Sequence, residues 1–244
     1  MVAIVTGATG GIGTAISVAL ARDGYDVVLV GRKVPVLRDT AELLRKKYTR
    51  QHFYWACVHL QSPREIKKLF IRKDIPLAQL SVLVNNAGVS QGDDIFTESE
   101  SDWNVGLSVN LTAPFLLSQL AVRLMKKNDT KGNIVNIASL AGLVGAKKPN
   151  YAASKAGLIG LTKATAREVG QFGIRVNAIA PGIVDTDLIA DWDEKKRKAV
   201  ISQTPLKKIA SAEEIAEIVS FLVSPKASFL TGTVINASGG QFLG

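Results

Sequence analysis

A tyrosine and a lysine four residues apart, Tyr151 and Lys155, suggest chemistry more directly than any other pair in the sequence. The Ala-rich stretch over residues 152–170 predicts a helix, and a spacing of four places the phenol and the ammonium on one face. A phenol titrates near pH ~10 in water, so we expect the neighbouring cation to lower the pKa of Tyr151 and make it a general acid. The same spacing also arises by chance on many helices, and other residues must decide between these interpretations.

A glycine-rich turn near the start of the chain indicates a nucleotide site. It lies between a predicted strand over residues 2–6 and a predicted helix over 14–22, and a second strand is predicted over 27–30. The turn reads Thr6-Gly7-Ala8-Thr9-Gly10-Gly11-Ile12-Gly13. Its glycines allow a tight turn and close approach of a pyrophosphate to the helix N-terminus. A plain strand-to-helix turn is the alternative, but the place at the head of a β-α-β unit favours dinucleotide binding.

The end of the second predicted strand bears on which dinucleotide would bind. An acidic residue there would bind the adenosine ribose and repel a 2′-phosphate, but the sequence reads Gly31-Arg32-Lys33. The cations favour NADPH/NADP+ over NAD. A solvated basic loop explains Lys33 about equally well, and Arg32 less well.

Polar residues follow two further predicted strands. Asn86 and Gly88 come after a strand over residues 80–84, and Ser139 follows a strand over 132–138. Asparagine in such a place most often stabilises a turn, and Ala-Gly beside it leaves room for a flat ring. Because ligands collect outside the carboxyl ends of parallel strands, we expect Ser139, Asn86 and the glycine-rich turn to share one edge of the sheet.

The alternation of strands and helices predicts one α/β domain over residues 1–244. Further strands are expected over 53–60, 174–180 and 231–236, and further helices over 34–48, 64–70 and 212–222. The fold class is a single-domain, Rossmann-like, doubly wound parallel sheet of about seven strands with helices on both faces. The polar, Lys-rich residues 185–209 are either a substrate lid or a plain surface helix.

Composition narrows the classes of protein. The 244 residues, 47% hydrophobic and 21% charged, fit one large globular domain. Cys57 is the only cysteine, so no internal disulfide can form, and we expect it to be a buried strand residue. With two histidines and one cysteine, a zinc site is not expected.

The net charge of +9 comes from many small basic groups. No aromatic interleaving or nucleic-acid motif accompanies them, so solvated helix faces are the main explanation and an acidic partner the minor one. The uncharged stretch over residues 103–122 is interrupted by polar side chains, which predicts a buried helix and no membrane span. Met1 is followed at once by a predicted strand, so no secretory leader is expected.

The motifs, taken in order, resemble those of the short-chain dehydrogenase/reductase family over essentially the whole chain. They are Thr6-Gly7-x-x-x-Gly11-x-Gly13, Asn85-Asn86-Ala87-Gly88, Asn110, Ser139, Tyr151-x-x-x-Lys155 and Pro181-Gly182. Within the family the chain is most similar to 3-oxoacyl-[acyl-carrier-protein] reductases, notably in residues 151–158, 176–182 and 229–232.

The resemblance implies a role for each matched residue. Tyr151 would protonate the substrate oxygen, Lys155 would hold the nicotinamide ribose and lower the Tyr151 pKa, Ser139 would donate a hydrogen bond to the oxygen, and Asn110 would position a water. The implied cofactor contacts are Gly7, Gly11, Ile12 and Gly13 at the pyrophosphate, Arg32 at the 2′-phosphate, Asn86, Ala87 and Gly88 at the adenosine, and Pro181, Gly182, Val184 and Thr186 at the nicotinamide side.

The sequence departs from the family pattern in four places. Gly10 stands where many NADP-using relatives have a basic residue, and His59-Leu60 stands where relatives usually have an aspartate near the adenine. Ser238 also replaces a usual aspartate, and the spacing from Ser139 to Tyr151 is one residue shorter than in some carrier-protein reductases.

The leading functional interpretation is NADPH-dependent reduction of 3-oxoacyl-[acyl-carrier-protein] in type II fatty acid synthesis by a homotetramer. An acidic carrier protein would be attracted by basic residues near the mouth of the site, with Lys126, Lys127, Lys131 and Arg167 as candidates. A reductase or dehydrogenase of another carbonyl or alcohol, such as a quinone, steroid or sugar, is the alternative, and a non-catalytic nucleotide-binding subunit is a third. The expected location is the cytoplasm, with the mitochondrial matrix or plastid stroma as alternatives.

Overall fold

A parallel sheet of seven strands forms the centre of the molecule. The computed structural model describes residues 1–243, apart from the side chain of Leu188. The strand order is β3-β2-β1-β4-β5-β6-β7. The strands are β1 (Val2–Thr6), β2 (Asp26–Gly31), β3 (Phe53–Cys57), β4 (Leu80–Asn85), β5 (Asn133–Ile137), β6 (Arg175–Pro181) and β7 (Val234–Ala237). The order reverses between β1 and β4, and ligands bind outside the carboxyl ends of the strands at such a point.

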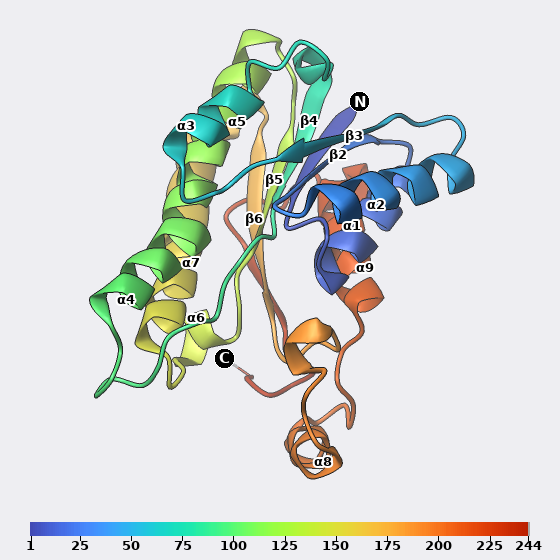
Figure 1. Ribbon diagram of the computed structural model, residues 1–244. Helices are drawn as coiled ribbons and strands as arrows, with labels where there is room; N and C mark the ends of the chain where they lie inside the picture. The colour runs from blue at the N-terminus through green and yellow to red at the C-terminus, as the bar shows by residue number, and fades with distance from the viewer. Residues whose placement is uncertain (244) are drawn as a thin grey trace.

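Helices cover both faces of the sheet (Figure 1). One face carries α1 (Gly11–Arg22), α2 (Val34–Lys47) and α9 (Ala212–Val223), and the other carries α3 (Pro63–Leu69), α5 (Ala113–Lys127) and α7 (Pro149–Val169). Three further helices, α4 (Glu100–Leu107), α6 (Ala141–Val144) and α8 (Glu194–Gln203), lie low in Figure 1, toward the carboxyl ends of the strands. Short 3-10 turns occur at Leu77–Gln79, Gly170–Phe172, Asp187–Ile189 and Pro225–Ala227. The predicted fold class is confirmed.

The alternation of side chains along each strand divides the core into two layers. In β1, Ala3 and Val5 belong to the layer under α1 and α9, whereas Val2 and Ile4 belong to the layer under α5 and α7. All four side chains have no exposed surface. A sheet covered on both faces reads as a continuous apolar run because successive side chains point to opposite faces. Burying each Val or Ile contributes ~1.5–3 kcal/mol, so the first five-residue strand alone anchors both layers.

Two helices at the site begin earlier than the sequence predicts. Helix α1 begins at Gly11 instead of residue 14, because the last glycines of the turn already adopt the helical conformation. Helix α7 begins at Pro149 instead of residue 152. Proline suits the first turn of a helix, where its missing N–H needs no partner. Tyr151 therefore lies within the first turn of α7.

Cys57 is exposed, so the prediction that it is a buried strand residue is wrong. The strand β3 ends at Cys57, three residues before the predicted end, and it is the outermost strand of the sheet. A side chain at the end of an edge strand is only partly covered by neighbours. The thiol donates to the carbonyl oxygen of Arg32 at 3.5 Å.

The stretch predicted as a buried helix is longer and less buried than expected. Helix α4 continues through a π-helical turn (Ser108–Thr112) into α5, which makes one helix over residues 100–127. By length and composition alone this helix could cross a membrane, but 39% of its apolar window is buried inside the fold. Leu117 and Met125 are fully buried in the core layer of that face. Packing on the sheet thus accounts for the apolar side of this helix.

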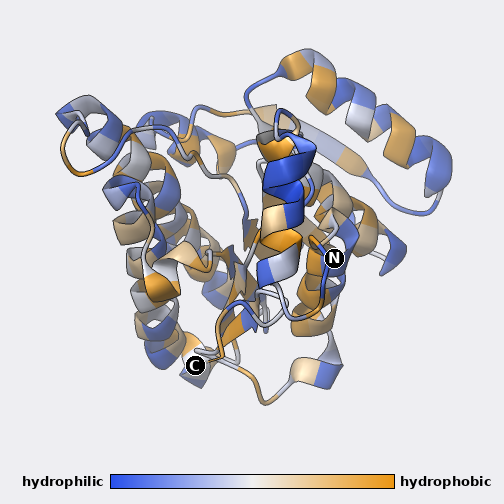
Figure 2. Ribbon diagram, turned by 90° about the horizontal axis from the view of Figure 1, so that it is seen from below, coloured by the Kyte–Doolittle hydropathy of each residue, from blue (hydrophilic) through white to orange (hydrophobic). Residues whose placement is uncertain are grey.

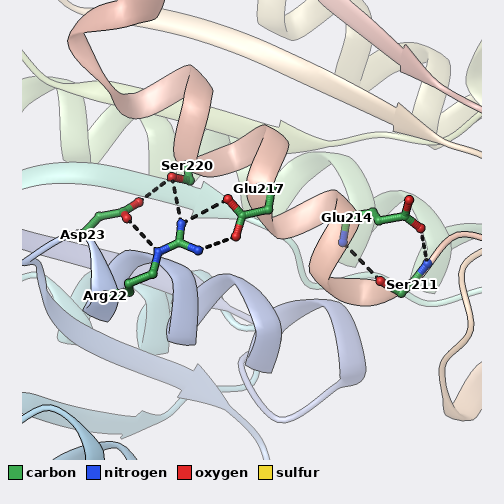
Figure 3. A network of polar contacts seen from close by, with 6 residues as sticks. All are labelled: Arg22, Asp23, Ser211, Glu214, Glu217 and Ser220. Atoms are coloured by element: carbon green, nitrogen blue, oxygen red, sulfur yellow. Dashed lines mark hydrogen bonds and ion pairs between the residues drawn. The ribbon is translucent and has the colours of Figure 1, made fainter.

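A charged network on the surface joins α1 to α9 (Figure 3). The guanidinium of Arg22 donates to both carboxylate oxygens of Glu217, and its Nε donates to Asp23 at 3.1 Å. The hydrogen bond from Arg22 lowers the pKa of the Glu217 carboxyl. Nearby, Ser211 and Glu214 form a capping box at the start of α9, with each backbone N–H bonded by the other side chain.

The predicted lid residues 185–209 contain the Asp187–Ile189 turn and α8. The base of the segment is closed by backbone hydrogen bonds, from the Asp185 N–H to the Ala210 carbonyl at 2.8 Å and from the Ala210 N–H to the Ile183 carbonyl at 3.2 Å. Arg197 on α8 ties the segment together by donating to the Asp185 carboxylate at 3.1 Å and the Ile189 carbonyl at 3.0 Å. In the view from below, α8 stands in front of the sheet with hydrophilic colouring along much of its length (Figure 2). The segment does contain a surface helix, and its movement as a lid stays a prediction.

Candidate active site

The end of β1 is joined to the end of β4 by side-chain hydrogen bonds. The hydroxyl of Thr6 accepts from the backbone N–H groups of Asn86 at 3.0 Å and Ala87 at 3.1 Å. The amide of Asn86 donates back to the carbonyl oxygens of Thr6 at 2.9 Å and Gly7 at 3.2 Å. Asn86 thus fixes the shape of the glycine-rich turn, which confirms the turn-stabilising interpretation of this asparagine.

The glycines of this turn are required by close contacts. Gly7 has a positive φ of 64°, and a Cβ there would lie 2.9 Å from the Cα of Ala87. A Cβ on Gly13 would lie 2.1 Å from the Gly7 carbonyl oxygen, and one on Gly11 would lie 2.8 Å from the Thr186 methyl group. Side chains are thereby kept away from the start of α1, where the first N–H groups have no partner within the helix. The geometry fits a pyrophosphate bound at this helix N-terminus.

Tyr151 and Lys155 lie together on α7, as the spacing predicts. The Nζ atom of Lys155 is 5.8 Å from the centre of the Tyr151 ring, and it donates to the Ile137 carbonyl at the end of β5 at 2.8 Å. Lys155 is only 3% exposed. Gly88 lies directly beside it, since a Cβ there would be 3.4 Å from Nζ. The pair is thus brought to the edge of the sheet that carries the glycine-rich turn.

The pKa values of this pair differ from the sequence-based expectation. Burial raises the pKa of the Tyr151 phenol, and a hydrogen bond with Ser139 opposes that rise. Burial also lowers the pKa of the Lys155 ammonium from 10.5 to about 8. The net shift of the Tyr151 pKa is upward, whereas the sequence predicts a lowered value, because loss of water disfavours both charged forms. Near neutral pH the phenol therefore keeps its proton and remains able to donate it.

Ser139 and Asn110 approach the pair from two further elements. Ser139 lies between β5 and α6, and its hydroxyl accepts from the Ala141 N–H at 3.1 Å. Asn110 lies in the π-helical turn and has no exposed surface. Its Oδ1 accepts from the Val89 N–H at 2.8 Å, and its Nδ2 donates to the Val89 carbonyl at 2.9 Å and the Ser154 hydroxyl at 3.0 Å. Both amide protons of Asn110 are therefore used within the protein.

The residues expected near the adenosine end lie after β2 and β3. Arg32 is exposed, and within residues 1–243 its guanidinium makes no ion pair or hydrogen bond. His59 is bound by Glu65, whose carboxylate lies 3.1 Å from the ring Nδ1 and accepts from the His59 N–H at 2.7 Å. Leu60 is half-buried beside it. A Cβ on Gly10 would meet only the Gly7 carbonyl, at 3.6 Å, so this position is open.

The residues expected at the nicotinamide end follow β6. The Pro181 carbonyl accepts from the Leu140 N–H at 2.8 Å, which joins β6 to the segment after Ser139. Gly182 is tightly packed, since a Cβ there would lie 2.9 Å from the Gln241 side-chain oxygen. Val184 is buried, and Thr186 lies over Gly11 of the glycine-rich turn. The start of the lid segment thus touches the start of α1.

The basic residues suggested for the mouth of the site lie elsewhere. Lys126 and Lys127 end α5, and Lys131 precedes β5, so all three lie at the amino edge of the sheet. Arg167 is sixteen residues along α7 from Tyr151, which is about 24 Å in a helix. The prediction that these four residues lie near the mouth of the site was wrong, because a sequence does not show at which end of a helix the site lies.

Sequence reasoning also passed over two buried polar residues of α7. Asn150 is 1% exposed and Ser154 has no exposed surface. Their spacing of four places them on one side of the helix, next to the side that carries Tyr151 and Lys155. Asn150 and Ser154 could have been predicted as site residues, because they are polar and lie at helical spacing beside the tyrosine–lysine pair.

Fold and site together define an α/β protein with a dinucleotide-type glycine turn and a tyrosine beside a buried lysine on the same sheet edge. A family model described as enoyl-(acyl carrier protein) reductase matches residues 7–241. The 3-oxoacyl-[acyl-carrier-protein] reductase FabG of Aquifex aeolicus (strain VF5) is 39% identical over 243 residues, which cover 99% of this chain and 97% of the relative. The (3R)-3-hydroxyacyl-CoA dehydrogenase of Mus musculus is 35% identical over 254 residues, with 99% and 96% covered.

A solved structure has the same fold. It is a putative 2-deoxy-D-gluconate 3-dehydrogenase from Agrobacterium tumefaciens with bound NADP, with a TM-score of 0.89 and 34% identity over 98% of this chain and 95% of that one. The chain therefore belongs to the short-chain dehydrogenase/reductase family, as its motifs predict. It is an NADP-dependent oxidoreductase that uses NADPH/NADP+.

Proposed function

We propose that the protein reduces 3-oxoacyl-[acyl-carrier-protein] to 3-hydroxyacyl-[acyl-carrier-protein] with NADPH in type II fatty acid synthesis. The observation behind this is the Tyr151 phenol, whose pKa is raised by burial, beside buried Lys155 at the same edge as the glycine-rich turn. The names of the Aquifex aeolicus relative and of similar relatives support the choice of substrate.

The catalytic roles follow from where charge develops during carbonyl reduction. NADPH, when bound, supplies the hydride to the carbonyl carbon. The phenol of Tyr151 donates its proton to the carbonyl oxygen, which becomes the product hydroxyl. The Ser139 hydroxyl donates a hydrogen bond to the same oxygen, where negative charge grows in the transition state. The Lys155 ammonium stabilises the phenolate left on Tyr151 until a proton returns from solvent. Asn110, through its hydrogen bonds to Val89 and Ser154, fixes the backbone next to Lys155.

The proposed cofactor contacts run along the carboxyl edge. They are Gly7, Gly11, Ile12 and Gly13 for the pyrophosphate, Arg32 for the 2′-phosphate, His59, Leu60, Asn86, Ala87 and Gly88 for the adenosine side, and Pro181, Gly182, Val184 and Thr186 for the nicotinamide side. Lys155 would donate to the nicotinamide ribose. The missing side chains at Gly7 and Gly11 support the first group, and the second is supported by the exposed Arg32, whose guanidinium has no partner within residues 1–243.

The wider setting belongs to the same proposal. A homotetramer binds the carrier protein, the lid over residues 185–209 covers the substrate, and the enzyme works in the cytoplasm, with the mitochondrial matrix or plastid stroma as alternatives. Exposed Lys147, just before α7, is nearer to Tyr151 along the chain than any of the four basic residues first considered for carrier docking.

A second candidate function has its own support. The NADP-bound structural relative is named for a sugar acid, and the mouse relative is named for a coenzyme A thioester. The tyrosine–lysine chemistry would serve any of these carbonyl or alcohol groups, because fold and hydride transfer do not fix the substrate. A non-catalytic subunit is disfavoured by the intact Asn110, Ser139, Tyr151 and Lys155.

The test follows the absorbance of reduced nicotinamide during turnover. Acetoacetyl thioester is offered on carrier protein and on coenzyme A, beside a panel of quinones and sugar-derived ketones, with NADPH or NADH. We expect the fastest turnover with the carrier-bound thioester and NADPH. Arg32→Ala should weaken NADPH binding by about 10–100-fold and leave NADH unchanged, since a charged hydrogen bond contributes about 1.5–3 kcal/mol. Reduction of free ketones alone would move the assignment to the second candidate.

A further inference from the structure

The irregular segment over residues 89–91, just after Gly88, is held mainly by side chains. Its three successive carbonyl oxygens each accept a side-chain hydrogen bond: Val89 from Asn110 at 2.9 Å, Ser90 from Lys148 at 2.6 Å, and Gln91 from Asn150 at 3.1 Å. The donors come from the π-helical turn and the start of α7. The segment is therefore positioned by the same elements that carry the proposed catalytic residues.

Asn150 links this segment to two helices. It is the second residue of α7, directly before Tyr151, and is only 1% exposed. Besides the Gln91 carbonyl, its Nδ2 donates to the Asp102 carbonyl of α4 at 3.0 Å. Both amide protons are thus used, and both fix backbone positions on other elements. Such a residue orients the first turn of α7, where Tyr151 lies.

The space around the Asn150 amide is shaped by two glycines. Gly92 has a φ of 97°, and a Cβ on it would lie 2.7 Å from the Asn150 Nδ2. A Cβ on Gly106 of α4 would lie 3.1 Å from the same nitrogen. A side chain at Gly92 would displace the amide, whereas one at Gly106 would press on it by only a few tenths of an ångström. The fit requires small residues on both neighbouring segments and a short, double-donor side chain at position 150.

The charged groups around this amide favour a neutral donor. Glu98 approaches from the loop before α4, since a Cβ on Gly92 would lie 2.7 and 2.8 Å from its carboxylate oxygens. Its Oε1 is buried without a partner in the described chain, and its Oε2 accepts from the Asp93 N–H at 2.9 Å. Asp102 turns its carboxylate to the Ser99 hydroxyl at 2.7 Å, and the ammonium of Lys148 is bound to Ser90. A carboxylate at position 150 would face two carbonyl oxygens and a neighbouring acid.

We propose that Asn150 is a positioning residue for proton donation: its amide fixes the Tyr151 turn of α7 against the 89–91 segment and α4. This inference rests on the proposed function, in which Tyr151 is the proton donor. Loss of the amide leaves the Tyr151 phenol intact but frees the first turn of α7, and the phenol with it, to shift. A displacement of about 1 Å at a reacting group can lower turnover by ~100-fold, so a large effect on kcat with little effect on cofactor affinity is expected.

The test compares Asn150→Ala with Asn177→Ala as a matched control. Asn177 is 2% exposed and also clamps a loop, donating to Leu230 at 2.8 Å and accepting from Thr233 at 3.1 Å, but it lies in the first half of β6, away from Tyr151. Both variants lose similar hydrogen bonds. We expect Asn150→Ala to lower kcat by about 10–100-fold with an unchanged NADPH dissociation constant, and Asn177→Ala to lower the melting temperature with kcat nearly unchanged.

Asn150→Asp supplies a readout that a purely structural role would not change. The new carboxylate cannot donate, but a protonated carboxyl donates one hydrogen bond, and burial beside Glu98 raises its pKa. The kcat ratio of Asn150→Asp to wild type should therefore rise as pH falls, whereas the ratio for Asn150→Ala should stay flat. The other titratable groups near it, Asp102, Lys148, Tyr151 and Lys155, are common to all variants and cancel in these ratios.

Hydrogen exchange gives a readout that is independent of activity. In Asn150→Ala, the peptide over residues 88–99 should exchange faster, while peptides from β1 and β4 should not change. Two outcomes would overturn the inference and leave the proposed function intact. In the first, wild type is active and Asn150→Ala is equally active. In the second, wild type is active and the kcat ratio of Asn150→Asp to wild type is independent of pH. A wild type inert to every thioester and ketone would overturn the proposed function and the inference together.

Discussion

Lys155 is a cation held inside the protein, and its surroundings decide the pH at which it loses its charge. Its side chain is almost fully buried, and burial lowers its pKa to about 8. In the unfolded chain a lysine titrates near ~10.4, so between about pH 8 and pH 10.4 the unfolded chain binds more protons than the folded one. Stability rises with pH wherever the unfolded state binds more protons. Lys155 therefore opposes folding most strongly below pH 8, and this penalty disappears as pH rises through that window.

This sign gives a thermodynamic prediction for Lys155→Met. The variant lacks the titrating group, so the melting temperature of wild type minus that of the variant should increase between pH 8 and pH 10. Scanning calorimetry or fluorescence melting at several pH values measures it, and other titrating groups cancel in the difference. A difference that falls with pH would mean that the folded state favours the ammonium, contrary to its burial.

Tyr151 gives the catalytic counterpart of that prediction. Tyr151→Phe removes only the hydroxyl from a partly buried ring, so we expect turnover to fall by at least about 100-fold while NADPH still binds. Tyr25→Phe is a suitable control, because it also removes a hydroxyl from a covered ring, but Tyr25 lies before β2, at the amino edge of the sheet. The measurements are kcat, from the absorbance of reduced nicotinamide during turnover, and NADPH binding, from a fluorescence titration. Retention of most activity in Tyr151→Phe would remove Tyr151 from the role of proton donor.

At the scale of elements, the glycine-rich turn and α1 act as one structure. The turn is tied to β4 by Thr6 and Asn86, and α1 starts at once after it. Two adjacent glycines of this turn differ sharply in the space around them: a Cβ on Gly10 meets only one atom at 3.6 Å, whereas one on Gly11 meets the Thr186 methyl group at 2.8 Å. A Cβ on Gly13 would overlap the Gly7 carbonyl at 2.1 Å.

The difference in space between Gly13 and Gly10 predicts different outcomes for Gly13→Ala and Gly10→Ala. Overpacking of a tight contact costs about 1–3 kcal/mol, and relief of the overlap at Gly13 must move either the turn or α1. Gly13→Ala should thus lower the unfolding free energy by that amount and weaken NADPH binding, while Gly10→Ala should do neither. Urea unfolding and cofactor titration on both variants measure this. Equal behaviour of the two variants would show that the turn tolerates side chains and does not need its glycines for close approach.

The sequence-based prediction succeeded where a pattern repeats over several residues. Parallel strands buried on both faces read as apolar runs such as Val2–Thr6, so the seven strands along the chain were visible, whereas their order across the sheet comes from the structure. The tyrosine–lysine pair was visible because a spacing of four places two residues on one face of a helix. The asparagine at the turn was visible because it comes directly after a predicted strand. Helix starts at Gly11 and Pro149 were missed because glycine and proline also occur in loops.

Features that depend on burial were not predictable. The rise in the Tyr151 pKa, the exposure of Cys57 and the two hydrogen bonds of Asn150 all come from distant segments that meet only in the fold. The π-helical turn around Asn110 belongs to this group too, because an extra residue in a turn leaves the apolar pattern nearly unchanged. Positions relative to the site, as for Lys126 and Arg167, need the direction of each helix as well.

At the scale of the whole molecule, the two apolar layers and the surface charges make unequal contributions. Helices α1 and α9 meet through buried residues such as Leu20 and Val219, which belong to one core layer with the sheet. Beside this seam lies the exposed network of Arg22, Asp23 and Glu217 (Figure 3). Exposed ion pairs are screened by water and salt, and their median contribution is about 0–1 kcal/mol. Burial of apolar surface should therefore hold α1 on α9.

Two substitutions on α1 separate these contributions. Leu20→Ala should lower the unfolding free energy by about 2–5 kcal/mol, because a fully buried leucine leaves a cavity. Arg22→Ala should lower it by less than about 1 kcal/mol, and that loss should shrink in high salt. Urea unfolding at low and high salt measures both, and the slope against urea concentration should stay that of wild type if the molecule unfolds as one unit. An Arg22→Ala loss as large as that of Leu20→Ala, and independent of salt, would mean that the charged network fixes the helix pair.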